Sequence, residues 1–330
     1  MERIAFFFGG NAVYWQNIVL ALAAVTAICF FLSFYLEKAG NPAAAFAVLP
    51  LAVFLSLIFA RFCHWYSRTD SYGGFLSAMK LYSPGGYALM GVFLGCFLAA
   101  ALVRLLSLSR SLPEMLDCMS IAGAAGIAVG RLASLFNSSD RGQVMDVLHF
   151  LPFSYPVVNA VSGATEYRFA VFLFQSIFCL ALFVCLASFY RKNRHRCPEG
   201  DACLIFLMGY CASQIVLDSI RYDSLFFRSN GFVSIVQVLS AIALVGGIVV
   251  FSRRLVKSRG FRAWFLLLWL AIAAALGGAG FMEYYVQRHG SAALFSYTVM
   301  SLCLALTLWI GLSIRRMAQT PGRKIGNPVR

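Results

Sequence analysis

Runs of roughly 20 apolar residues recur along the whole chain, with shorter polar segments between them. Each run is long enough to cross the hydrocarbon core of a bilayer, which is about 30 Å thick. A helix satisfies its backbone hydrogen bonds internally, so the runs predict helices. The nine predicted spans are residues 17–36, 44–62, 86–103, 115–135, 169–190, 202–220, 232–251, 263–282 and 294–314. The pattern therefore predicts an all-α, polytopic integral membrane protein.

The composition supports the same class. Hydrophobic residues make up 61% of the 330 residues, charged residues only 12%, and the mean hydropathy is +0.78. A soluble domain carries about 25% charged residues, so the low charged share of this chain predicts that it lies in a membrane. The first apolar run is too long for a signal peptide and lacks a small-residue cleavage site after a short core. It predicts a helix that is retained.

The net charge of +14 comes from 27 Lys and Arg against 13 Asp and Glu. Most of the basic residues fall in alternate loops between the predicted spans. They are Lys38, Arg104, Arg110, Arg191, Lys192, Arg194, Arg196, Arg253, Arg254, Lys257, Arg259, Arg262, Arg315, Arg316, Arg323, Lys324 and Arg330. Basic loops stay in the cytoplasm, so an odd number of spans predicts an outside N-terminus and a cytoplasmic C-terminus. The basic runs indicate topology and contact with anionic lipid, and not nucleic-acid binding.

The ten cysteines do not predict a metal centre. They are scattered, mostly inside apolar runs, and no C-x-x-C pair occurs. His195, Cys197 and Cys203 fit no zinc spacing, and their loop is strongly basic. The chain also lacks internal repeats, which argues against an inverted-repeat transporter.

Four charged residues lie at the ends of predicted spans, and charges at membrane depth are expensive and usually functional. They are Arg61, Arg131, Asp218 and Arg221. Glycines at 123, 126 and 130 precede Arg131 and predict a closely packed helix. Asp218 and Arg221 are three residues apart, so we expect them to share a helix face and form an ion pair. A packed bundle with two or three guanidinium groups favours an anion, and near the outer leaflet the plentiful anion is a lipid phosphate.

Five segments carry a family resemblance. They are Leu112-Pro113-Glu114-Met115-Leu116-Asp117 running through Gly130-Arg131 to Phe136-Asn137, then Gly85-Gly86-Tyr87-Ala88-Leu89-Met90-Gly91, Arg61, the stretch from Gln214 through Asp218 and Arg221 to Asp223, and Ser234 to Ser240. In this order they resemble the bacterial prolipoprotein diacylglyceryl transferase family. The resemblance runs from about residue 13 to residue 251 and leaves the last two spans unmatched. It therefore predicts a seven-helix core over 1–255, followed by an added transmembrane hairpin and basic tail over 256–330.

The resemblance implies an enzyme of a bacterial cytoplasmic membrane. Such enzymes move a diacylglyceryl group from phosphatidylglycerol to the lipobox cysteine thiol of a preprolipoprotein at the outer face, without metal or organic cofactor. On this basis Arg131, Arg221 and Asp218 are the predicted catalytic residues. The predicted headgroup-binding residues are Arg61, Asn137, Gln214, Gly86 and Met90.

The chain also departs from the family pattern. Met90 replaces a His or Tyr, Gln214 replaces an Arg, and Phe174-Gln175 replaces a Tyr-Glu pair. Ala133 and Ser134 replace a Gly-Asn, and Ser139 or Asp140 stands where the family has an acid. Two alternatives to transfer follow from these losses. One is a catalytically reduced member that binds phospholipid or a lipoprotein partner without transferring anything, and the other is a transporter outside the family.

Overall fold

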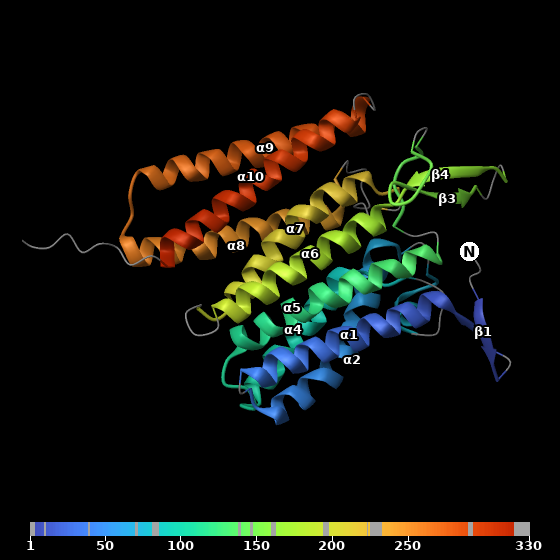
Figure 1. Cartoon of the computed structure of the whole chain (residues 1–330), viewed down its shortest axis with the longest axis horizontal. Helices are drawn as coiled ribbons and strands as arrows, with labels where there is room; N and C mark the ends of the chain where they lie inside the picture. The colour runs from blue at the N-terminus through green and yellow to red at the C-terminus, as the bar shows by residue number, and fades with distance from the viewer. Residues whose placement is uncertain are drawn as a thin grey trace, which may run out of the picture. The chain divides into compact units, whose positions relative to one another are not determined.

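The computed structural model describes residues 4–9, 11–38, 40–69, 72–80, 86–137, 140–145, 148–159, 163–193, 198–222, 224, 233–289 and 293–319. Most of these residues are helical (Figure 1). The helices are α1 (Trp15–Glu37), α2 (Pro42–Ser67), α3 (Phe75–Met79), α4 (Leu89–Leu105), α5 (Leu112–Arg131), α6 (Val171–Lys192), α7 (Asp201–Ile220), α8 (Ile235–Arg259), α9 (Trp264–His289) and α10 (Ala293–Gln319). A 3-10 helix, η2 (Leu132–Leu135), continues α5. Strands β1 (Ile4–Phe8) and β2 (Asn11–Tyr14), and β3 (Ser154–Val158) and β4 (Thr165–Phe169), form two hairpins.

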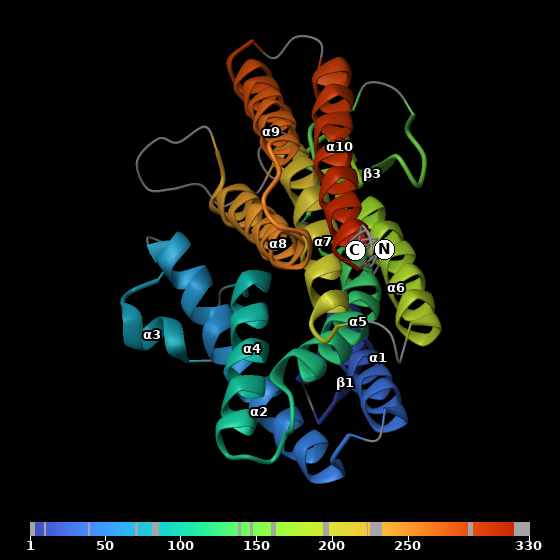
Figure 2. The same cartoon turned by 90° about the vertical axis from the view of Figure 1, so that its left-hand side faces the viewer.

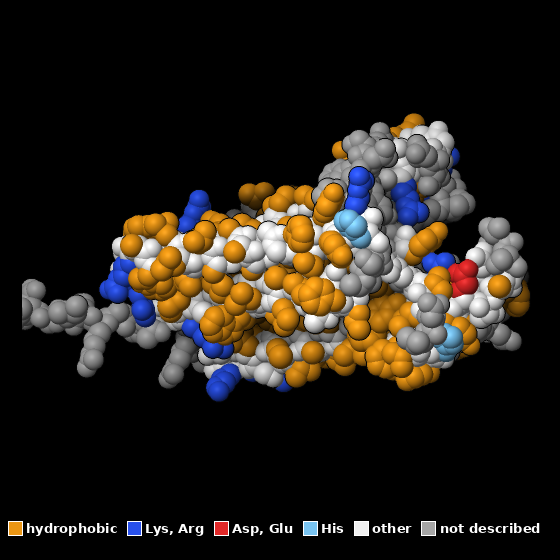
Figure 3. All heavy atoms as spheres, turned by 90° about the horizontal axis from the view of Figure 1, so that it is seen from above, with side chains coloured by type: hydrophobic (Ala, Val, Ile, Leu, Met, Phe, Trp, Pro, Cys, Tyr) orange, Lys and Arg blue, Asp and Glu red, His pale blue; other side chains and the backbone are white. Residues whose placement is uncertain are grey.

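Each of the nine predicted spans coincides with an apolar helix. Within the described residues, eight helices are long and apolar enough to cross a membrane, and α4 is a shorter apolar helix of 17 residues. The predicted polytopic helical membrane protein is therefore confirmed, while the ninth crossing and the orientation stay predictions. Figure 3 shows hydrophobic side chains spread over the visible flank of the helices, as expected for a surface that faces lipid.

The chain divides into two compact units. The first contains Met1–Phe206 and Ile220–Val236, and the second contains Leu207–Ser219 and Gln237–Arg330. The second unit thus groups most of α7 and most of α8 with α9 and α10. The boundary that the sequence predicted at residue 255 falls inside α8, and that division stays a prediction.

In the first unit, glycines allow two pairs of helices to pack closely (Figure 2). A Cβ added at Gly91 or Gly95 of α4 would collide with the backbone of α2. A Cβ added at Gly126 of α5 would lie 2.9 Å from the Cβ of Ala27 in α1. The predicted close packing before Arg131 is confirmed at Gly126, whereas Gly123 has no neighbour within 4 Å of an added Cβ. These contacts fix α5 and hence the position of its last residue.

The β3–β4 hairpin is a feature that the apolar pattern did not predict. Its strands pair antiparallel, with Tyr155 opposite Arg168. The segment before the hairpin adds to the other edge of β4, because Gly142 N donates to Phe169 O at 2.8 Å and Met145 N donates to Tyr167 O at 2.8 Å. This small sheet carries the chain that follows α5 to the start of α6.

In the second unit, α9 and α10 form an antiparallel pair whose interface includes Gly278 and Cys303. An added Cβ at Gly311 of α10 would collide with Met208 of α7 and lie 3.1 Å from Ile248 of α8. The C-terminal hairpin is therefore packed onto α7 and α8. Lys and Arg side chains gather at the end where α8 and α10 finish (left in Figure 3).

Candidate functional site

Arg131 is the last residue of α5 and lies at one end of the first unit. Helix α5 has 20 residues and is therefore about 30 Å long, the thickness of a bilayer core. At its start, Ser111 caps the helix by accepting a hydrogen bond from Glu114 N. Lys38 forms an ion pair with Glu114 there, with Nζ 3.5 Å from Oε1. Arg131 thus lies about a full membrane thickness from the Lys38–Glu114 ion pair at the start of α5.

Arg131 and Arg221 are joined through one carboxylate, that of Asp140. Arg131 Nη1 lies 2.8 Å from Asp140 Oδ2, and Arg221 Nη2 lies 2.8 Å from Asp140 Oδ1. Ser134 Oγ donates a further hydrogen bond to Oδ2 at 2.9 Å. Asp140 is only 7% exposed, and both guanidinium groups are mostly buried. Two arginines that each hold one oxygen of the same anion form a site for a small oxyanion.

Asp140 is ionised because of these neighbours. Burial by itself raises the pKa of a carboxyl group, but the charges of Arg131 and Arg221 and the hydrogen bond from Ser134 hold the pKa of Asp140 well below its usual range. The cluster of two guanidinium groups and one carboxylate therefore carries a net charge of +1.

Arg141 holds the loop that carries Asp140. Its guanidinium group donates to the backbone oxygens of Ser134 at 3.3 Å and of Pro156 at 3.5 Å, and also to that of Asn137. It also lies over the Tyr155 ring, 4.4 Å from the ring centroid. Asn137, a predicted headgroup residue, thus contributes its backbone carbonyl to the support of this loop.

The backbone brings Arg221 to the same loop. Gly142 and Arg221 form an isolated antiparallel bridge, and Tyr222 N donates to Arg141 O at 2.9 Å. An added Cβ at Gly142 would lie 2.9 Å from the Cβ of Phe169, so a glycine permits this approach. Arg131 and Arg221, which the sequence placed on separate helices, therefore meet at a loop that lies between them in sequence.

Arg61 and Gly86 lie in a separate arrangement within the first unit. Arg61 is fully buried, with Nε donating to Ala78 O at 2.6 Å and Nη1 donating to Gly86 O at 3.3 Å. Its guanidinium group stacks on the rings of Tyr72 and Tyr87. Met90 follows as the second residue of α4 and is half-buried. The headgroup-binding role of Arg61, Gly86 and Met90 stays a prediction.

Gln214 and Asp218 belong to the second unit and are both buried in α7. Among the described residues, no partner hydrogen-bonds to Nε2 of Gln214. The ion pair expected between Asp218 and Arg221 stays a prediction, and the structure adds Asp140 as a carboxylate partner of Arg221.

Asp140 and Arg141 are the residues whose roles the sequence did not reveal. From the sequence, either Ser139 or Asp140 stands where the family has an acid, and Ser139 lies outside the described residues. The available signal was an adjacent Asp-Arg pair in the segment between two apolar helices. This signal indicates a polar cluster but does not show which residues pair with Asp140.

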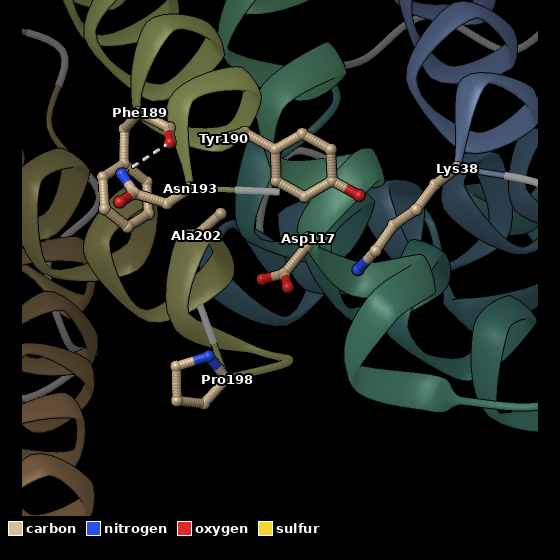
Figure 4. Close-up of a pocket in the computed structure, with 7 residues that line it drawn as sticks. All are labelled: Lys38, Asp117, Phe189, Tyr190, Asn193, Pro198 and Ala202. Carbon is tan, nitrogen blue, oxygen red and sulfur yellow. Dashed lines mark hydrogen bonds between the residues drawn. The ribbon is translucent and has the colours of Figure 1, made fainter. Parts of the chain in front are cut away.

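At the opposite end of α5, Asp117 serves a different purpose. Its Oδ2 accepts from Gly200 N at 2.8 Å and its Oδ1 from Cys203 N at 2.7 Å, so it caps the N-terminus of α7. Figure 4 shows it in a small pocket with Lys38 and Tyr190. A carboxylate committed to a helix cap is a structural feature. No group of three or more His, Cys, Asp or Glu side chains suited to a metal ion occurs within the described part of the chain.

Most of the chain is similar to known proteins of one family. The family model for prolipoprotein diacylglyceryl transferase matches residues 3–253. The phosphatidylglycerol–prolipoprotein diacylglyceryl transferase of Parasynechococcus marenigrum is 27% identical over 256 residues, covering 74% of this chain and 90% of the relative. The enzymes with the same name from Pediococcus pentosaceus and Thermotoga maritima are 24% and 26% identical, over 78% and 75% of this chain and 93% and 83% of their own lengths. Since the family model matches most of the chain, this protein belongs to the prolipoprotein diacylglyceryl transferase family.

Proposed function

We propose that this protein transfers a diacylglyceryl group from phosphatidylglycerol to the lipobox cysteine of a preprolipoprotein. The observation that carries the proposal is the pair of guanidinium groups from Arg131 and Arg221, which already hold one oxyanion between them. Family membership supports the reaction, since the relatives are named for it.

The reaction makes negative charge at the phosphate. The cysteine thiolate attacks the diacylglyceryl carbon that bears the phosphate oxygen, so a C–S bond forms as the C–O bond breaks. The electron pair of that bond stays on the phosphate, which changes from a diester with one charge to glycerol phosphate with two. The proton of the thiol passes to solvent water, because the thiolate is the nucleophile.

Arg131 and Arg221 suit this change in charge. Guanidinium groups bind phosphate oxygens with parallel N–H donors, and charge-assisted bonds of this kind are about twice as strong as neutral ones. Their attraction grows as the second charge develops, so they stabilise the transition state more than the bound substrate. Asp218 is a further predicted member of this site, and Asn137, Gln214, Gly86, Met90 and Arg61 are predicted to shape the headgroup pocket.

The proposed place of the reaction is the outer leaflet of a bacterial cytoplasmic membrane. Arg131 lies at the far end of α5 from Lys38, and basic loops face the cytoplasm. With nine crossings and an outside N-terminus, the Arg131 end of the first unit faces the outer surface. There a lipid headgroup and a translocated lipobox segment can meet.

One alternative is binding of phospholipid without transfer. Gln214 in place of the family arginine favours it, since its amide supplies no charge. Met90 in place of His or Tyr favours it as well, because a thioether does not donate a hydrogen bond.

The test is complementation of bacteria that are depleted of their own diacylglyceryl transferase, with mass spectrometry of a lipoprotein substrate. We expect the chain to restore growth and the thioether-linked lipid, and the Arg131→Ala variant to restore neither. Arg288→Ala is the matched control, because Arg288 is an exposed arginine in α9, outside the family match. Binding of phosphatidylglycerol without lipidated product, at normal membrane expression, would establish the alternative.

A further inference from the structure

Asp140 occupies the place that the proposed function assigns to a phosphate. Each of its two oxygens accepts from a different arginine, at 2.8 Å in both cases. A phosphate group can also present separate oxygens to two guanidinium donors. The planar carboxylate and the tetrahedral phosphate therefore accept from the same kind of donor pair. The same N–H groups of Arg131 and Arg221 cannot hold both anions at once.

We propose that Asp140 is a displaceable internal ligand of the arginine pair, which leaves when the lipid phosphate enters and returns when glycerol phosphate departs. This inference rests on the proposed function and names how its site opens and closes. The exchange on entry is neutral in charge, because a carboxylate with one charge is replaced by a phosphodiester with one charge. While no lipid is bound, the carboxylate of Asp140 supplies a counter-charge to both guanidinium groups.

The surroundings of Asp140 allow its side chain to move while the loop stays in place. Arg141 anchors the loop independently, through the backbone oxygens of Ser134 and Pro156 and the ring of Tyr155. The amide of Phe172 also donates to the backbone oxygen of Asp140 at 3.3 Å. None of these contacts involves the carboxylate of Asp140. A rotation of the Asp140 side chain therefore leaves the backbone support intact.

Asp140 adopts a left-handed backbone conformation, with φ of +57°. Aspartate adopts this region more readily than most residues other than glycine. In this conformation the carboxylate contacts both arginines.

The return of Asp140 favours product release. The product carries two charges and binds two guanidinium groups more tightly than the diester does. A carboxylate that competes for the same donors lowers the apparent affinity for every anion by the fraction of time that it occupies them. Without such a competitor, glycerol phosphate would remain bound and inhibit the next cycle.

The test compares Asp140→Asn with the unchanged full-length protein in phosphatidylglycerol vesicles, measuring inhibition of transfer by added glycerol phosphate. We expect the inhibition constant for glycerol phosphate to fall about tenfold, together with kcat, because the neutral amide competes poorly for the arginines. Glu166→Gln is the matched control, since Glu166 pairs with Arg168 at 2.8 Å in the β3–β4 hairpin. An inhibition constant that rises or stays the same in a folded Asp140→Asn variant overturns the proposal, because Asp140 then only orders the arginines.

Direct binding of glycerol phosphate, followed by thermal shift, separates this proposal from the proposed function. If Arg131→Ala leaves the binding unchanged, the phosphate site itself is wrong. If Arg131→Ala abolishes binding but Asp140→Asn does not tighten it, only the role of Asp140 is wrong. Should Asp140→Asn fail to fold, Ser134→Ala removes one of the bonds that hold the carboxylate, and we expect a smaller tightening in the same direction, its absence being contrary to the proposal.

Discussion

Arg61 and Arg131 are both arginines near the ends of apolar helices, yet their guanidinium groups are satisfied in different ways. Arg61 is fully buried and donates to the backbone carbonyls of Ala78 and Gly86. Arg131 keeps some exposure and pairs with a side-chain carboxylate. Backbone carbonyls cannot leave without unfolding the local chain, whereas a carboxylate side chain can rotate away. The proposed exchange of ligands is therefore open to Arg131, whereas the contacts of Arg61 are with the backbone.

The largest effect expected from this comparison is on activity, in Arg131→Lys. A lysine offers a point charge in place of the planar fork, so we expect kcat/KM for lipidation to fall about a hundredfold. The melting temperature should change little, because Asp140 keeps its contacts with Arg221 and Ser134. The measurement is a lipidation assay in vesicles, with Arg288→Lys as the control. Activity within a few-fold of the original would show that Arg131 contributes only its charge.

Arg61→Lys should give the opposite result. The lysine cannot reach both carbonyl oxygens and cannot stack on two tyrosine rings, so buried acceptors lose their donors at a cost of about 1–3 kcal/mol each. We expect a lower melting temperature and a smaller loss of activity per folded molecule than in Arg131→Lys. Arg68→Lys, an exposed arginine at the end of the same helix, is the control. A raised KM for phosphatidylglycerol at an unchanged melting temperature would instead support the headgroup role predicted from the sequence.

Gln214→Arg tests whether a further arginine increases the rate of lipidation. The family has an arginine at this position, and the amide nitrogen of Gln214 has no hydrogen-bond partner among the described residues. Because a charged donor stabilises a developing phosphate charge better than a neutral one, we expect lipidation to rise about tenfold. Gln143→Arg, at an exposed position in the loop before β3, controls for added positive charge. An equal rise in both variants would indicate general attraction of anionic lipid.

The smallest effect concerns pH. The pKa of Asp140 is lower in the folded protein than in the unfolded chain, so its ion pairs stabilise the fold above the unfolded pKa of about 4. That stabilisation is lost as the pH falls further, through the folded pKa. We therefore expect a constant melting temperature from about pH 7 to 5 and a decline below about pH 4. Asp140→Asn should show a shallower decline, and an identical decline would assign the effect to other carboxyl groups.

The two arginines of the site could be predicted from the apolar pattern of the sequence. Arg131 and Arg221 were identifiable because charges at the ends of membrane helices are rare and each one stands out. Asp140 did not stand out, because it lies in a polar loop where charged residues are common. The sequence left open whether Ser139 or Asp140 stands where the family has an acid, and only the path of the loop shows that Asp140 reaches both arginines.

Similar reasoning explains what was missed in the fold. The β3–β4 hairpin is short and mixed in character, so neither its composition nor a helical period predicted it. The close contact of α2 and α4 depends on Gly91 and Gly95, and a glycine in an apolar run does not reveal which helix it faces.

The sequence alone determined that this protein lies in a membrane, where its helices run, and that its candidate site holds charged residues suited to an anion. Hydrophobic length and the scarcity of charge act locally along the chain, so they can be seen without a structure. Tertiary structure decided which ligand each arginine holds. That choice depends on contacts between residues far apart in sequence, such as Gly142 with Arg221, which bring a loop carboxylate between two helix ends. Arg61 and Arg131 are the same residue type near the ends of helices, and only their neighbours in space distinguish them.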